Sequence, residues 1–202
     1  MKQGLFITME GPDGSGKSTQ IEAIRRFFEE KGDEVIITRE PGGTKISEKI
    51  RDLLLDRENS EMAPMAEAML YAASRAQLVA QVIKPALDEG VHVICDRFVD
   101  SSIAYQGFGR ELGDSVAVIN AYAINDCIPD ITFLMKLNPE IGKSRIKASD
   151  HDRSEMEKLD FHNRVFAGYE ALEQEYPDRI VGIDATRNIE EISSEILYHV
   201  ER

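Results

Sequence analysis

The stretch that most constrains the fold of this chain is a glycine-rich segment near the N-terminus. Residues 11–18 read Gly-Pro-Asp-Gly-Ser-Gly-Lys-Ser and fit the pattern G-x-x-x-x-G-K-[S/T]. The segment directly follows the apolar run Leu5–Met9 and precedes a segment of helical period. Glycines in such a loop turn backbone N–H groups toward a phosphate, and the helix N-terminus adds its partial positive charge. The sequence therefore predicts a strand, a phosphate-binding loop and a helix in succession.

Apolar, β-branched runs alternate with longer segments of helical period along the whole chain, which is typical of an α/β fold. Strands are expected at Leu5–Met9, Glu34–Thr38, Val91–Cys95, Ile131–Lys136 and Arg179–Asp184. Helices are expected between the loop and Gly32, after Thr44, over Pro64–Lys84 until Pro85 interrupts it, over Asp114–Asp126 and over Asn188–Val200. Nearly continuous apolar strands need helices on both faces of a parallel sheet. We expect a single domain, 1–202, with three α/β/α layers.

Composition limits the partners of the chain. Its 202 residues, 42% of them hydrophobic, are enough for one core and do not demand two domains. Lys and Arg total 24 against 37 Asp and Glu, a net charge of -13, so nucleic acid polymers and acidic membranes are repelled. The first apolar run meets Glu10 too soon for a signal peptide or membrane span, so we expect a soluble, cytoplasmic protein. The spacing of the cysteines and histidines predicts no metal site, disulfide or catalytic histidine.

The phosphate loop predicts where a nucleoside triphosphate binds. Lys17 is expected to reach the β- and γ-oxygens of a nucleoside triphosphate, and the Ser18 hydroxyl to ligate Mg²⁺. The third predicted strand ends in Asp96 and Arg97, at the sheet edge where open α/β folds bind ligands. Asp96 is expected to orient Mg²⁺ or its water and Arg97 to grip a second phosphate; the alternative is a surface ion pair at the strand end. The triphosphate-binding residues are predicted to be Gly11, Pro12, Asp13, Gly14, Ser15, Gly16, Lys17, Ser18 and Thr19.

Several stretches together resemble thymidylate kinase. They are Phe6–Thr19, Thr38–Thr44, Tyr71–Leu78, Asp96–Gln106 and Ile183–Ala185, so the resemblance covers nearly the whole chain. The strings R-E-P-G-G-T and D-R-x-x-x-S-x-x-A-Y-Q are far more specific than the phosphate loop. The resemblance implies a P-loop nucleoside monophosphate kinase with a five-stranded parallel sheet in the order 2-3-1-4-5. It also implies transfer of the γ-phosphoryl group of Mg·ATP to dTMP in dTTP biosynthesis, and a homodimer.

By the same resemblance, matching residues are expected to bind dTMP. Arg39 and Arg97 would hold the acceptor phosphate, and two arginines suit one dianion. Asp13 would contact the 3′-hydroxyl of the acceptor, since a carboxylate turned toward the triphosphate would be repelled. Tyr71 would stack on thymine and Arg75 would bond a base carbonyl, although the helical spacing of Tyr71 alone would indicate a core residue. Residues that would line the base and sugar pocket are Ser101, Ser102, Tyr105 and Gln106, with Tyr105 near the ribose 2′ position. Glu10 is expected to neighbour the site; its alternative is a solvated acid at the strand end.

A catalytic arginine is expected outside the phosphate loop. Some family members carry it within the loop, but Gly14 and Ser15 occupy those positions here. By resemblance to the bacterial-type members it should come from a small lid at about 145–158, where Arg153 is our choice. Arg145 is expected near the donor adenine, with Lys147 in support; a solvated charged helix face is the alternative reading of these residues. The predicted catalytic set is therefore Asp13, Lys17, Asp96, Arg97 and Arg153.

Three other functions fit parts of the sequence. A deoxynucleoside kinase of similar fold or another nucleoside monophosphate kinase would share the phosphate loop, as would a non-catalytic module that senses nucleotides. The pair Arg39 and Arg97 favours an acceptor that already bears a phosphate. The chain departs from the commoner family pattern at Lys136 and Asn138, where an acid would be expected in one of the two. Asn138 still suits a helix N-cap before Pro139, so we interpret this as structural drift.

Overall fold

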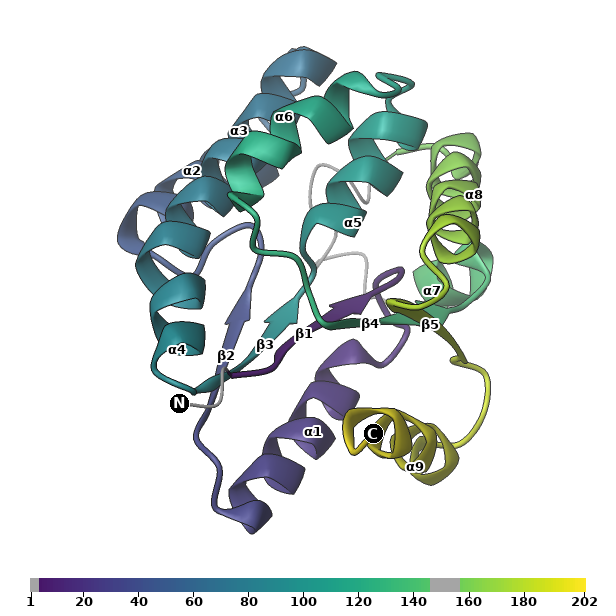
Figure 1. The fold of residues 1–202 in the computed structure, drawn as a ribbon. Coiled ribbons are helices and arrows are strands. Elements are labelled where there is room, and N and C mark those ends of the chain that lie inside the picture. The colour runs from purple at the N-terminus through teal and green to yellow at the C-terminus, as the bar shows by residue number, and fades with distance from the viewer. Residues whose placement is uncertain (1–3, 146–156) are drawn as a thin grey trace.

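The computed structural model describes residues 4–145 and 157–202. Within them the chain forms a five-stranded parallel sheet in the order β2-β3-β1-β4-β5 (Figure 1). The strands are β1 Phe6–Glu10, β2 Val35–Arg39, β3 His92–Asp96, β4 Ile131–Lys136 and β5 Ile180–Asp184. All neighbours pair in parallel, and Met9 of β1 is in register with Asp96 of β3 and Phe133 of β4. The α/β class and the strand order of the prediction are confirmed.

Helices cover both faces of the sheet. Helices α1 (Lys17–Lys31) and α9 (Ile189–Val200) lie on one face, and most of the others lie on the opposite face (Figure 1). The others are α2 Lys45–Leu55, α3 Pro64–Leu78, α4 Lys84–Asp88, α5 Val99–Ser102, α6 Ser115–Ile124, α7 Pro139–Arg145 and α8 Leu159–Glu175, with π-helical segments η1 Val79–Ile83 and η2 Ile103–Gly109. No helix in the described ranges is long and apolar enough to cross a bilayer.

The alternation of side chains along the strands explains the layers. Ile7 and Met9 of β1 pack in the cluster with α1 and α9, whereas Phe6 packs in the cluster that contains α3 and η1 residues. Every residue of β1 is buried. This matches the central place of β1 in the order, since a central parallel strand is covered on both faces. The phosphate loop follows β1 and so starts from the middle of the sheet.

The prediction that Pro85 interrupts the third helix was wrong. Helical structure continues from Pro64 through η1 and α4 to Asp88. Proline normally breaks a helix because its ring hits the carbonyl of residue i−4 and it lacks an N–H. Here the backbone has already changed register: the N–H of Lys84 bonds to the carbonyl of Val79, five residues back. Pro85 therefore enters in the first turn of α4, where its missing donor is tolerated.

Candidate active site

The carboxyl edge of the sheet carries the predicted site. Glu10, Arg39 and Asp96 end β1, β2 and β3. A cavity opens there between the phosphate loop, β2, α3 and the segment after β3. We call this cavity the acceptor cavity, because every residue that was predicted to bind the acceptor borders it. These residues are Asp13, Arg39, Tyr71, Arg75, Arg97, Ser101, Ser102, Tyr105 and Gln106. Segments far apart in the sequence are thus brought together as expected.

The phosphate loop holds its lysine against its own backbone. Gly14 and Gly16 have φ of 75° and 95°, a left-handed conformation that side chains disfavour. Nζ of Lys17 donates to the carbonyl oxygens of Gly11 and Pro12, each at 3.1 Å, and lies 3.5 Å from Oδ1 of Asp13. Burial, and secondly the charge of Arg97, lowers the pKa of Lys17. A triphosphate in the loop would supply oxygens in place of these carbonyls.

Arg97 links the phosphate loop to the acceptor cavity. Its Nη2 donates to Oδ1 of Asp13 at 2.9 Å, and its guanidinium lies 5.2 Å from the ring centre of Tyr105. The Arg97 backbone has φ of 68°, which is strained for a residue with a Cβ. Oδ1 of Asp13 therefore lies between Arg97 and Lys17, and it is closer to Arg97.

Asp96 has an unsatisfied oxygen in the described structure. Its Oδ1 is buried without a hydrogen-bond partner among the described residues. Asp96 borders the acceptor cavity and also a second hollow that Ser18 borders. A buried carboxylate oxygen with no donor is costly, so it fits a cation or a water bound to one. The described residues contain no cluster of three or more His, Cys, Asp or Glu that could hold a metal by protein ligands alone.

Arg39 borders the cavity but is paired with a carboxylate of α2. Its Nη1 and Nη2 donate to the two oxygens of Glu48 at 2.9 and 3.0 Å. The hydrogen bond from Arg39 is the main cause that lowers the pKa of Glu48. Both side chains are partly exposed, at 45% and 42%, so this is a surface pair of small net stability. An acceptor phosphate would have to compete with Glu48 for this arginine.

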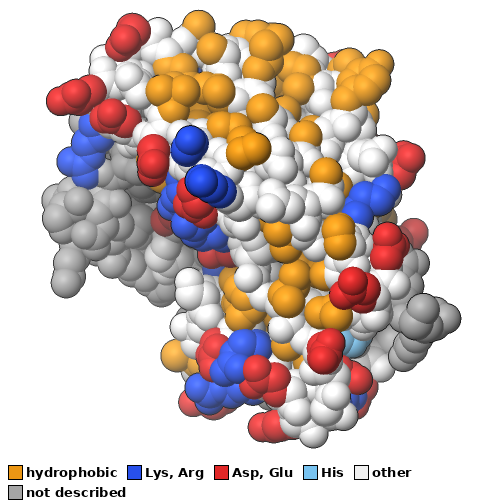
Figure 2. Space-filling model, turned by 90° about the vertical axis from the view of Figure 1, so that its left-hand side faces the viewer, with side chains coloured by type: hydrophobic (Ala, Val, Ile, Leu, Met, Phe, Trp, Pro, Cys, Tyr) orange, Lys and Arg blue, Asp and Glu red, His pale blue; other side chains and the backbone are white. Residues whose placement is uncertain are grey.

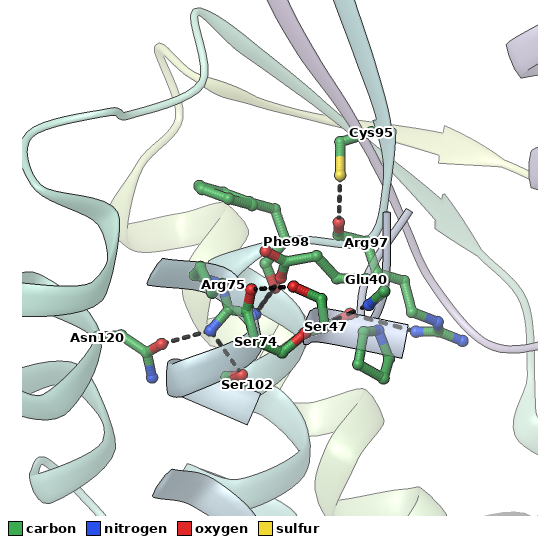
Figure 3. A network of polar contacts seen from close by, with 12 residues as sticks. Glu40, Ser47, Ser74, Arg75, Cys95, Arg97, Phe98, Ser102 and Asn120 are labelled. Atoms are coloured by element: carbon green, nitrogen blue, oxygen red, sulfur yellow. Dashed lines mark hydrogen bonds and ion pairs between the residues drawn. The ribbon is translucent and has the colours of Figure 1, made fainter. Parts of the chain in front are cut away.

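Arg75 is the centre of a buried polar network (Figure 3). Nη1 donates to Oγ of Ser102 at 3.0 Å and to Oδ1 of Asn120, while Nη2 donates to Glu40 and to the carbonyl of Phe98. Its Nε is buried without a partner among the described residues. The guanidinium is therefore held in one orientation at the border of the cavity. Glu40 and Asn120, which lie 35 and 45 residues from Arg75, were not among the residues predicted from the sequence.

Comparisons with known proteins identify the family of this chain. The sequence profile of the family described as thymidylate kinase matches residues 9–196. The chain belongs to the thymidylate kinase family. It is 50% identical to a thymidylate kinase of an Exiguobacterium species over 98% of this chain and 95% of that one. It is also 50% identical to the thymidylate kinase of Lactobacillus delbrueckii subsp. bulgaricus, over 94% and 92%. The crystal structure of thymidylate kinase from Ehrlichia chaffeensis superposes with a TM-score of 0.80 at 31% identity, covering 98% of this chain and 99% of that one.

In this thymidylate kinase family member, Glu10 is buried beneath the acceptor cavity. Its Oε1 accepts from the N–H of Phe98 at 2.8 Å, and its Oε2 accepts from Oγ of Ser101 and from the hydroxyl of Tyr169, the latter at 2.9 Å. Burial is the main cause that raises the pKa of Glu10. The alternative of a solvated strand-end acid is excluded because the residue is fully buried.

Tyr169 of α8 is a site neighbour that the sequence did not reveal. Its hydroxyl also lies 2.9 Å from Oγ of Ser101 and accepts from Nη1 of Arg97 at 3.3 Å. In the sequence it continues the apolar stripe of Phe161 and Val165 at four-residue spacing. That pattern indicates a core residue, so only the packing of α8 against the site shows its second role.

The remaining predicted residues belong to the expected lid at about 145–158. Arg153 and Lys147 fall outside the described residues, and Arg145 ends α7 with no side chain described.

At Lys136 and Asn138 the chain departs from the commoner family pattern. Nζ of Lys136 donates to Glu173 of α8 at 2.7 Å. Oδ1 of Asn138 accepts from the N–H of Glu140 at 2.8 Å, as expected for a residue that caps α7.

Proposed function

We propose that this chain transfers the γ-phosphoryl group of Mg·ATP directly to the phosphate of dTMP, giving dTDP and ADP. As a member of its family it is a thymidylate kinase, a nucleoside monophosphate kinase that phosphorylates dTMP to dTDP. The observation that carries the mechanism is the convergence of the acceptor residues on one cavity beside the phosphate loop. In-line transfer needs no covalent intermediate, because positioning and electrostatics supply the catalysis.

The binding of Mg·ATP is assigned to the phosphate loop together with Ser18 and Asp96. Lys17 and the loop N–H groups would bind the β- and γ-phosphates, in place of the carbonyls that Lys17 now contacts. Ser18 and Asp96 would hold Mg²⁺, directly or through water, and the unsatisfied Oδ1 of Asp96 supports this. Magnesium with one or two protein ligands and several phosphate oxygens is a common arrangement. When bound, the ion neutralises charge on the transferring group.

The acceptor end is assigned to the residues around Arg97. Arg97 and Arg39 would hold the phosphate of dTMP, and Asp13, 2.9 Å from Arg97, would accept from the 3′-hydroxyl. Tyr71 would stack on the base, while Arg75 would donate to a base carbonyl from its fixed position. Arg153 would stabilise the transferring group from the lid and Arg145 would lie near adenine. These roles are proposals that rest on the family motifs and on the cavity.

We also propose a cytoplasmic homodimer formed through α3 and α6, the cytoplasm being where soluble nucleotide substrates are found. Figure 2 shows apolar side chains gathered on the upper part of the face that carries α2 and α3. Met69 of α3 and Val118 and Tyr122 of α6 are 55%, 60% and 84% exposed. Large exposed apolar side chains on adjoining helices are typical of an interface. A light-scattering mass of one chain at micromolar concentration would rule the dimer out.

A panel of acceptors tests the reaction. ADP release from Mg·ATP should be strongest with dTMP and should depend on added Mg²⁺. Turnover of thymidine alone would instead favour a deoxynucleoside kinase, and turnover of only AMP or CMP another monophosphate kinase. ATP binding without ADP release from any acceptor would favour a nucleotide-sensing module.

A further inference from the structure

Helix α3 presents one more polar residue on the face that borders the acceptor cavity. Glu67, Tyr71 and Arg75 are spaced four residues apart and so share one side of the helix. Glu67 is only 2% exposed, although a glutamate is rarely buried without partners. Glu67 was not among the residues predicted from the sequence. Its partners show what this buried carboxylate does.

Glu67 is bound by two side chains from η2 and its end. Nε2 of Gln106 donates to Oε1 of Glu67 at 2.8 Å. Arg110 donates to both oxygens, from Nε to Oε1 at 3.3 Å and from Nη2 to Oε2 at 3.1 Å. An ion pair with a guanidinium favours the ionised carboxylate, whose oxygens only accept hydrogen bonds. The group of Gln106 that faces Glu67 must therefore be its NH₂.

This contact determines which end of the Gln106 amide is available to a ligand. Gln106 borders the acceptor cavity and is 3% exposed. With one N–H of its amide donated to Glu67, its carbonyl oxygen and its second N–H remain, and within the described residues no side chain donates to the oxygen. A free amide can present either atom, because the two orientations have nearly the same shape. A fixed one keeps its oxygen and its second N–H in set positions, so the place of the oxygen always presents an acceptor.

We propose that Glu67 is a positioning residue for base selection, which holds the Gln106 amide so that its oxygen accepts from N3–H of the pyrimidine. This rests on the proposed function, because it concerns the base of the acceptor. Thymine and uracil have a donor at N3 and an acceptor at O4, the edge that a Gln106 oxygen and an Arg75 donor would match. Cytosine has an acceptor at N3 and an amino group at C4, so both contacts would fail. A buried polar group left unpaired by the wrong ligand is a strong source of discrimination.

The test compares Glu67→Gln in two backgrounds. Alone, it should lower the ratio of kcat/KM for dTMP over dCMP on the order of tenfold, because the new amide offers Gln106 a donor as well as an acceptor. The ratio of dTMP to dUMP should stay within about twofold, since both bases have the same N3 and O4 groups. In a Gln106→Met background, Glu67→Gln should leave the dTMP to dCMP ratio unchanged. Equal effects in both backgrounds would show that Glu67 acts only through stability and would overturn the proposal.

Two further arms keep the test decisive. If Glu67→Gln does not fold, as judged by thermal unfolding, Glu67→Asp takes its place, since it keeps the charge beside Arg110 and withdraws from Gln106. In the wild type, the 3-deaza analogue of dTMP, which has C–H at position 3, should bind on the order of tenfold more weakly in calorimetry. Equal binding of the analogue would overturn the proposal. If the wild type fails to turn over dTMP, the proposed function fails; if it turns dTMP over while Glu67→Gln keeps the wild-type ratio, only this inference fails.

Discussion

At the scale of single residues, each cation of the site donates hydrogen bonds to oxygen atoms of the protein itself. Lys17 is held by loop carbonyls, Arg39 by Glu48 and Arg97 by Asp13. Each contact puts a cation beside the place where a phosphate is proposed to bind. Charge-assisted hydrogen bonds to phosphate are stronger than those to neutral carbonyls, so a phosphate can displace the carbonyls at Lys17. The arrangement keeps these cations satisfied while leaving them free to exchange partners.

Replacing Arg97 tests the assignment of the acceptor phosphate. Arg97→Ala removes charge-assisted hydrogen bonds worth about 1.5–3 kcal/mol each, so dTMP affinity should fall at least tenfold. ATP affinity should change far less, because Lys17 and the loop N–H groups hold the donor. Calorimetric titration of the variant with each nucleotide measures both. Equal weakening of ATP and dTMP would contradict the assignment.

Replacing Tyr169 tests whether its hydroxyl positions Arg97. Tyr169→Phe keeps the ring and removes the bonds to Glu10, Ser101 and Arg97. We expect KM for dTMP to rise about three- to tenfold with a smaller change in KM for ATP, because one hydrogen bond contributes about 0.5–1.5 kcal/mol. Steady-state kinetics with each substrate varied in turn measures this. A variant that is less stable but has wild-type KM for dTMP would show a purely structural hydroxyl.

At the scale of elements, the sequence predicted strands better than it predicted the ends of helices. Each strand lies within one residue of its predicted bounds, because apolar runs and the loops that follow them mark strand ends clearly. The passage through Pro85 could not be predicted, since the π-helical register of η1 depends on packing against the sheet. The residues that the motifs predicted to bind the acceptor do border one cavity. The motifs missed Tyr169 and Glu67, whose contacts with the site join residues 159 and 39 positions apart.

The contact between η2 and α8 should depend on a single glycine. A Cβ on Gly109 would lie 2.7 Å from Phe161 and 2.9 Å from Val165, closer than packed atoms allow. Gly109→Ala should therefore lower the free energy of unfolding by about 1–3 kcal/mol, as overpacking does. Gly107→Ala is a matched control in the same segment, because its Cβ would meet no atom closer than 3.6 Å. Urea unfolding measures both, and equal stabilities of the two variants would contradict the close packing.

At the scale of the whole molecule, a chain of net charge -13 encloses buried acids next to a cationic site. Glu40 is 5% exposed, and its burial raises its pKa to about 7 despite the neighbouring Arg75. Glu10 is also buried and has a raised pKa. A folded state with raised carboxyl pKa values binds more protons than the unfolded chain. Stability from these groups is therefore highest at low pH and is lost as the pH rises from about 4.5 to about 7.

Replacing Glu40 should reduce this pH dependence. Glu40→Gln cannot ionise, so the decrease in melting temperature between pH 5 and pH 8 should be smaller than in the wild type, even though loss of the Arg75 pair lowers the melting temperature overall. Thermal unfolding at constant ionic strength measures the two slopes. Glu34→Gln, at an exposed position just before β2, removes one charge without touching this network and should keep the wild-type slope. An unchanged slope in Glu40→Gln would mean that Glu40 is ionised in the folded protein throughout this range, with Arg75 outweighing the cost of its burial.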